Sequence, residues 1–195
     1  MNFGLICLNL RIIHKTSYPM KKQVIFLIMV LLVVSCGTKS EKGNVVEDCD
    51  MSEVKAVDLG LSVLWADCNL NATAISEYGD YYTFNDALTL NIGGWRLPTK
   101  EELEELSSEC DWQWVAIDGC YGYNVIGSNG NSIFFPAAGF KTDGELFKVG
   151  EIGNYWTSSQ EDDAKWFLDF NKDGYYINSM TLDDAQSVRL VKAKN

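Results

Sequence analysis

The chain has 195 residues, with 16 lysines and arginines against 27 aspartates and glutamates, and its formal net charge is −11. A field of this sign repels phosphate backbones and anionic lipid headgroups, which argues against nucleic-acid binding and against electrostatic adsorption to membranes. An apolar fraction of 47% and an aromatic fraction of 12% predict a folded domain, because disordered chains lack such content.

Residues 20–35 have the layout of a bacterial lipoprotein signal. A basic start at Met20 precedes an apolar run at 23–34, and the small residue Ser35 stands directly before Cys36. A helix of that length rises about 18 Å, too short for roughly 30 Å of hydrocarbon. We therefore expect cleavage before Cys36, which becomes the lipid attachment site, and anchoring in the outer membrane, facing the periplasm or the cell surface. A core helix or an uncleaved anchor is the alternative.

This layout divides the chain into four parts. Residues 1–19 are an upstream extension, 20–35 the signal, 36–52 a polar tether that begins with the acylated cysteine, and 53–195 a single domain. The mature chain would carry 12 basic and 27 acidic side chains and no histidine, since the only one is His14. This excludes Ser-His-Asp and Cys-His catalysis and histidine-ligated zinc.

Four cysteines remain after Cys36, namely Cys49, Cys68, Cys110 and Cys120. Export implies an oxidising compartment, and four cysteines allow three pairings. Cys110 and Cys120 flank an expected hairpin, an arrangement that would allow them to lie close together. The alternative is that Cys68 and Cys110 are small buried apolar residues.

The domain reads as short strands punctuated by Asn-Gly and Asp-Gly turns, with two helices near its start. Thr83 is expected to cap a helix at 84–90, and Thr99 opens a second helix with a capping box to Glu102. A hairpin is expected around the turn Asp118-Gly119. Strands are expected at 57–66, 112–117, 121–126, 132–135, 155–158, 164–170, 175–180 and 187–192. The order predicts an α+β fold with two short helices packed on mixed, mostly antiparallel sheets.

Several stretches, in their order and spacing, resemble the Fibrobacter succinogenes major paralogous domain (Fib_succ_major) of Bacteroidota lipoproteins. They are residues 57–66, 78–82, 94–99, 129–139, 155–159 and 187–191. The resemblance implies a C-type-lectin-like fold that displays a binding surface, although a fold does not fix the ligand. The related formylglycine-generating enzymes use a late cysteine pair, and no cysteine follows Cys120 here, so that activity is not carried over.

The same resemblance places a ligand face after the Tyr-Trp-Thr-Ser-Ser stretch. The candidate contacts are Trp156, Ser159, Gln160, Asp162, Lys165, Tyr175, Tyr176 and Asn178. Ordinary hairpin surface is the alternative. We expect non-catalytic binding of an extracellular glycan or protein. A structural or accessory subunit of an envelope or adhesive assembly is the second interpretation, and a glycan-acting enzyme with a carboxylate pair is the third.

One stretch matches the opening of an EF-hand calcium loop. Asp169, Asn171 and Asp173 stand at its first, third and fifth positions, followed by Gly174. The twelfth position is Met180, where calcium needs a glutamate, and a hairpin turn at 172–174 explains the same residues. We therefore expect no metal or other cofactor, with calcium as the weaker alternative.

Overall fold

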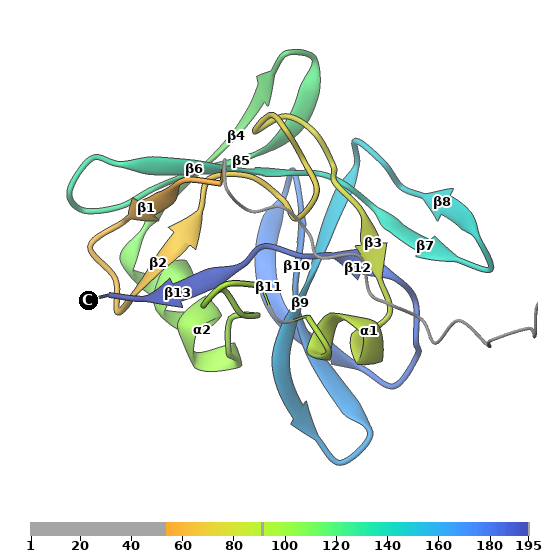
Figure 1. Cartoon of the computed structure of the whole chain (residues 1–195). Helices are drawn as coiled ribbons and strands as arrows, with labels where there is room; N and C mark the ends of the chain where they lie inside the picture. The colour runs from red at the N-terminus through yellow and green to blue at the C-terminus, as the bar shows by residue number, and fades with distance from the viewer. Residues whose placement is uncertain (1–53, 91, 195) are drawn as a thin grey trace, which may run out of the picture. The chain divides into compact units, whose positions relative to one another are not determined.

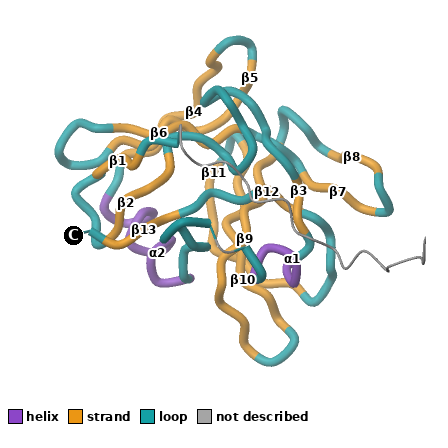
Figure 2. Tube along the Cα trace, viewed as in Figure 1, coloured by secondary structure: helices purple, strands orange, loops and turns teal. Residues whose placement is uncertain are grey.

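The computed structural model describes residues 54–90 and 92–194, all of which fall within one compact unit, Val45–Asn195. The predictions for the extension, the signal, the tether, Cys36, Cys49 and the domain start at residue 53 lie outside the described residues. Strands and loops make up most of the domain, beside two short helices (Figure 2). Within the described ranges, no helix is long and apolar enough to cross a membrane.

The strands form a central sheet and three smaller ones (Figure 1). The central sheet has the order β11 (Gly174–Met180), β10 (Ala164–Asn171), β9 (Ile152–Glu161), β12 (Gln186–Ser187) and β3 (Tyr81–Tyr82). The smaller sheets are β1 (Ala56–Asp58), β2 (Val63–Ala66) and β13 (Val191–Ala193); β4 (Asp111–Ile117), β5 (Cys120–Ile126) and β6 (Ser132–Pro136); and β7 (Phe140–Thr142) with β8 (Glu145–Phe147). Among these ladders only β12 with β9 is parallel. The fold is therefore α+β and mainly β, with mixed, mostly antiparallel sheets as predicted.

Both predicted helices are present. In α1 (Phe84–Leu88) the Thr83 side chain accepts the backbone N–H of Asp86, and the helix ends two residues earlier than expected. In α2 (Lys100–Glu109) the capping box is complete, because the Thr99 and Glu102 side chains each bond the other's backbone N–H. These local bonds satisfy donors that a helix start leaves open.

Two of the predicted strands are broken. The stretch 57–66 forms β1, a turn and β2, because Gly60 has a φ of 84° and its N–H bonds the Asp58 carboxylate. The stretch 187–192 divides into β12 and β13. Between them, the carbonyls of Val188 and Leu190 accept from Leu70 and Ala66, so the chain crosses from the central sheet to the sheet of β2. One break results from a backbone angle and the other from contacts between residues that are distant in sequence. Hydrophobic patterning predicts neither of these causes.

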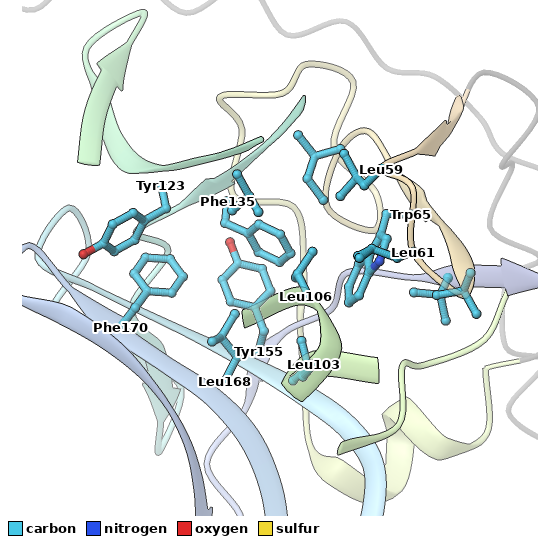
Figure 3. Packing of buried hydrophobic residues seen from close by; sticks show 14 of the residues in the cluster. Leu59, Leu61, Trp65, Leu103, Leu106, Tyr123, Phe135, Tyr155, Leu168 and Phe170 are labelled. Atoms are coloured by element: carbon cyan, nitrogen blue, oxygen red, sulfur yellow. The ribbon is translucent and has the colours of Figure 1, made fainter. Parts of the chain in front are cut away.

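The main core lies between one face of the central sheet and the sheet of β4, β5 and β6 (Figure 3). Tyr123 meets Phe170 edge to face with ring centroids 5.4 Å apart, and Phe135 meets Tyr155 at 5.1 Å. Helix α2 adds Leu103 to this core. Burying a leucine of this kind stabilises a fold by about 1.5–3 kcal/mol. The packing therefore fixes the β4–β5 hairpin against β10 and β11.

A buried arginine joins the segments around this core. The side chain of Arg189 is 1% exposed, and its guanidinium donates to the Asn69 side chain and to the carbonyls of Ala66, Asp67 and Phe134. It also lies 4.6 Å from the centroid of the Phe135 ring. The acceptors come from two separate stretches, residues 66–69 and Phe134, so one charged group joins both of them to the segment that carries Arg189.

Candidate binding groove

The β4–β5 hairpin positions a stripe of aromatic side chains. Its two turn residues, Asp118 and Gly119, have φ values of 50° and 81°, as a tight hairpin turn with two positive angles requires. Ile117 then pairs with Cys120, and Trp114 pairs with Tyr123. Because side chains alternate between the faces of a strand, the following side chains share one face: Trp112, Trp114, Tyr121 and Tyr123.

The stripe emerges from the core toward the tip of the hairpin. Tyr123 is 5% exposed, whereas Tyr121 is 52% exposed. Trp114 stands between them and is braced edge-on by Tyr123 and Phe170, with ring centroids 5.2 and 6.3 Å away. The rings of Trp114 and Tyr121 are parallel to within 8°, with centroids 6.3 Å apart. The hairpin therefore presents two aligned aromatic rings on a rigid support.

These two rings form one wall of an open groove of about 510 Å³. The rest of the lining consists of the turn before β9 with its first residue (Gly150, Glu151 and Ile152) and the end of β10 with the turn that follows it (Asn171, Lys172 and Asp173). Volumes of roughly 300–1,000 Å³ are typical of small-ligand sites. The groove thus combines an aromatic surface with a short row of hydrogen-bonding groups.

The polar wall is held in place by local bonds. The Asn171 side-chain oxygen accepts the backbone N–H of Asp173 at 2.8 Å and fixes the turn. Lys172 pairs with Asp173 at 3.1 Å, and Lys148 pairs with Glu151 at 2.8 Å. All four ion-pair partners are exposed, and such pairs contribute only about 0–1 kcal/mol. A ligand hydroxyl can therefore replace a lysine as a partner at little cost.

Two further hollows have different linings. One, of about 540 Å³, lies at Cys68, Ala72 and Ile75 and has no aromatic side chain in its described lining. The other, of about 430 Å³, lies at Lys141 and Asp184 and is lined by one aromatic residue, Tyr81. The Tyr81 hydroxyl already donates to the Ala138 carbonyl at 2.5 Å. The groove at Trp114 is therefore the better candidate for a ligand.

The structure corrects the prediction for Trp156. Its side chain is 0% exposed, its ring meets Phe84 of α1 edge-on at 5.4 Å, and its Nε1 donates to the Tyr82 carbonyl. Trp156 therefore belongs to the core on the second face of the central sheet and offers no surface to a ligand. The apolar face of α1 determines this burial, and the strand pattern alone does not reveal it.

Two other predicted contacts make structural bonds. The Ser159 hydroxyl accepts the backbone N–H of Lys100 and joins β9 to the start of α2. The Lys165 ammonium pairs with the Asp183 carboxylate at 2.8 Å, and the Lys165 side chain is mostly buried. Neither side chain lines the groove.

The remaining predicted contacts lie at different places along the ladder of β9, β10 and β11. Gln160 and Asp162 are at the β9–β10 turn, where the Gln160 amide donates to the Asp162 carbonyl. Tyr175 is near the opposite end and stacks on Trp112 with centroids 4.3 Å apart. Eight strand residues separate the two ends by about 23 Å. Figure 1 shows the β9–β10 and β4–β5 hairpins projecting from opposite sides of the domain. The predicted set thus does not converge on one site.

Tyr176 and Asn178 share the face of the sheet that points away from Tyr175. Tyr176 is 60% exposed, and the Asn178 amide donates to the Asp169 carboxylate at 2.9 Å. Burial raises the pKa of Asp169, and the bond from Asn178 partly opposes that rise. These residues remain accessible surface but lie outside the groove.

The EF-hand-like stretch forms a strand end and a hairpin turn. Asp169 lies in β10, Asn171 pairs with Gly174, and the Asn171 side chain bonds within the turn. In the part of the chain that the structure describes, no group of three or more acidic, cysteine or histidine side chains could hold a metal ion. The hairpin therefore explains the residues that suggested calcium.

Cys68, Cys110 and Cys120 are free thiols, and the structure does not bring Cys110 and Cys120 together. Cys110 ends α2 and directly precedes Asp111, which pairs with Ile126, whereas Cys120 pairs with Ile117. The seven-residue strand β4 therefore separates them. Burial raises the pKa of the Cys110 thiol to about 11, and the negative charges of two nearby glutamates contribute a smaller part of that rise.

Sequence reasoning did not select Trp114 and Tyr121, although the signal was available. The predicted hairpin with an Asp-Gly turn already fixes Trp114 on the same face as Tyr121. The missing information was the position of the β10–β11 turn beside them, which depends on packing between two sheets.

Comparison with known proteins corrects the family suggested by the sequence motifs. The model of the Lcl C-terminal domain matches residues 56–192, and the resemblance to the Fibrobacter succinogenes major paralogous domain is not supported. No curated protein and no solved structure matches the chain. The match extends from β1 to β13 and so includes every residue of the groove. The chain belongs to the Lcl C-terminal domain family.

Proposed function

We propose that the protein is an envelope lipoprotein that displays a non-catalytic binding domain for an extracellular glycan or protein. The observation that carries the proposal is the groove between the aligned rings of Trp114 and Tyr121 and the polar turn at 171–173. Rigid aromatic surface beside short polar groups is typical of recognition sites. The family match suggests a lipoprotein or cell-surface protein, which supports the same proposal.

Within this proposal the domain has a C-type-lectin-like architecture. Three features support it: two short helices near the start of the domain, a mixed central sheet, and pairing of the first strands with the last in the sheet β1-β2-β13. Recognition would require no cofactor.

The membrane anchor is tested at Cys36. Replacing it (Cys36→Ala) should abolish metabolic labelling with a radioactive fatty acid and leave the protein unprocessed or released. A Cys68→Ala variant serves as the control, because that thiol is buried in the domain. Normal acylation of Cys36→Ala would contradict the anchor, and outer-membrane fractionation of the wild type tests its location.

Binding is tested with the purified full chain in detergent micelles. The chain is applied to a glycan array and, separately, to immobilised extracellular proteins, each with calcium and with EDTA. We expect specific retention by one class of ligand in both conditions, and loss of that retention in Tyr121→Ala. Failure to bind either class, or identical binding by Tyr121→Ala, would contradict a recognition role for the groove.

A structural role is the second candidate, because β8 and the turn after it expose Leu146, Phe147 and Val149. An exposed apolar strand at a sheet edge is a common docking element. If the protein is an accessory subunit of an envelope assembly, Leu146→Asp should release it from that assembly during sedimentation of solubilised membranes. Co-sedimentation unchanged by that substitution would argue against this role.

We propose no reaction at the groove. Its two carboxylates, on Glu151 and Asp173, are each paired with a lysine at the surface. A glycosidase needs one carboxylic acid held protonated beside a second carboxylate, usually in an apolar pocket. Open exposure of both groups favours binding over hydrolysis.

A further inference from the structure

We infer that the ligand of the groove is a neutral saccharide whose pyranose rings lie against Trp114 and Tyr121. The inference rests on the proposed function and specifies the ligand class of the same site. It depends on three properties of the groove: the arrangement of its rings, the chemistry of its polar wall and the sign of the surrounding charge.

The aromatic wall matches the shape of a sugar. A pyranose ring carries a flat face of C–H groups and a rim of hydroxyls, so it pairs with an aromatic face flanked by hydrogen-bonding groups. The rings of Trp114 and Tyr121 are parallel to within 8° and therefore share one orientation. Tyr123 and Phe170 support Trp114 edge-on, so little conformational freedom is lost when a ligand docks.

The polar wall matches the hydroxyl rim. It offers the carboxylates of Glu151 and Asp173, the ammonium of Lys172 and the amide of Asn171. Carboxylates accept hydrogen bonds from hydroxyls, while the amide and the ammonium donate. A polyhydroxyl ligand uses both kinds of group, whereas a purely apolar ligand would leave these groups unpaired.

Charge determines which saccharides are favoured. Two carboxylates and one ammonium line the groove, and residues 54–194 carry 22 acidic and ten basic side chains. Uronic acids and sulfated sugars would approach against this field and meet no unpaired cation in the lining that the structure describes. The observations therefore favour an uncharged glycan over an anionic one.

The size of the groove suits a saccharide. Its volume of about 510 Å³ lies in the range of small-ligand sites. A glycan chain can thread an open groove, contacting it with a few residues at a time.

The test uses the full chain in detergent micelles, titrated with soluble polysaccharides while tryptophan fluorescence is recorded. The neutral probes are barley β-glucan, yeast α-mannan and wheat arabinoxylan, and the anionic probes are polygalacturonate and alginate. Tyr121→Ala removes the more exposed ring. Tyr176→Ala is the matched control, because Tyr176 is a tyrosine of similar exposure, 60% against 52%, on the face of the sheet that points away from the groove.

We expect at least one neutral probe to bind and both anionic probes to fail. Tyr121→Ala should weaken that binding about fivefold to tenfold, and Tyr176→Ala by less than about twofold. Asp173→Lys should add measurable binding of polygalacturonate, because it reverses the charge of one wall. Thermal melting of each variant within about 2 °C of the wild type would show that the fold is intact.

Four results would overturn the inference: no neutral probe binds, an anionic probe binds the wild type best, Tyr121→Ala binds as tightly as the wild type, or Asp173→Lys leaves polygalacturonate unbound. The proposed function has a separate readout. If the neutral probes fail while an immobilised extracellular protein retains the wild type and not Tyr121→Ala, the domain remains a binding module and only the saccharide assignment is refuted.

Discussion

The buried guanidinium of Arg189 should be the most sensitive single position for stability. It makes five hydrogen bonds to four acceptors, at distances between 2.7 and 3.2 Å. Arg189→Met keeps much of the volume and removes every donor. The acceptors on Asn69, Ala66 and Phe134, whose bonds to Arg189 are fully buried, then lose this partner.

The expected cost follows from these three acceptors. Each buried acceptor left unpaired costs about 1–3 kcal/mol, and part of that sum is offset because the charge no longer has to be buried. A net loss of about 3–5 kcal/mol in the free energy of unfolding is therefore expected for Arg189→Met. At about 2–4 °C per kcal/mol, the melting temperature should fall by about 6–20 °C. Urea unfolding followed by tryptophan fluorescence measures the free energy directly.

A matched control is Arg96→Met. Arg96 pairs with Glu102 at 2.5 Å and is itself 47% exposed, although the Glu102 side chain is only 13% exposed, so loss of Arg96 should cost about 1 kcal/mol. If Arg189→Met also unfolds within about 1 kcal/mol of the wild type, the buried carbonyls do not depend on the guanidinium, and the reasoning is refuted.

Three further predictions concern pH, metal and redox state. Burial raises the pKa of Glu102, but the bonds from Arg96 and from the Thr99 N–H outweigh it and hold the pKa below its ordinary value of 4.5. The ionised Glu102 carboxylate should therefore contribute fully to stability well above pH 4.5, and its contribution should decline as the pH falls through the folded-state pKa. The urea midpoints of the wild type and of Glu102→Gln should accordingly converge in acid. The melting temperature should be the same in calcium and in EDTA, because the EF-hand-like stretch is a hairpin turn; a rise of several degrees in calcium would contradict this. Peptide mapping without reductant should find no Cys110–Cys120 link, and finding that link would show that the β4–β5 hairpin is wrongly placed.

The sequence was sufficient to predict those parts of the structure that depend on contacts between neighbouring residues. Thr99 and Glu102 form a capping box within one helical turn, and Asp118 with Gly119 fixes a hairpin between adjacent strands. In each case the interacting groups are at most four residues apart, so residue type and spacing determine the outcome.

The sequence was insufficient to predict those parts of the structure that depend on contacts between residues far apart in the chain. The stretch at 57–66 was predicted to be one strand because apolar residues occupy every second position in it, yet Gly60 turns the chain. Trp156 was interpreted as a ligand contact because the family resemblance placed a ligand face at this stretch, yet α1 covers it and it is fully buried. Burial of this kind depends on which helix packs on which face of a sheet.

The groove illustrates the same limit at the level of function. Trp114 and Tyr121 lie in the predicted hairpin, while Asn171 and Asp173 attracted attention only as possible calcium ligands. The packing of Tyr123 on Phe170 brings the two regions together. Residue types indicated recognition, but only the tertiary arrangement shows which aromatic and polar side chains share one surface.

Hydroxyl-radical footprinting of the full chain, with and without a bound polysaccharide, tests the central claim most directly. Trp114 and Tyr121 should be oxidised readily in the free protein and protected when the ligand is bound, while Tyr176 stays equally reactive. Protection at Tyr176 instead, or unchanged oxidation of Trp114 and Tyr121 at saturating ligand, would contradict a binding site in this groove.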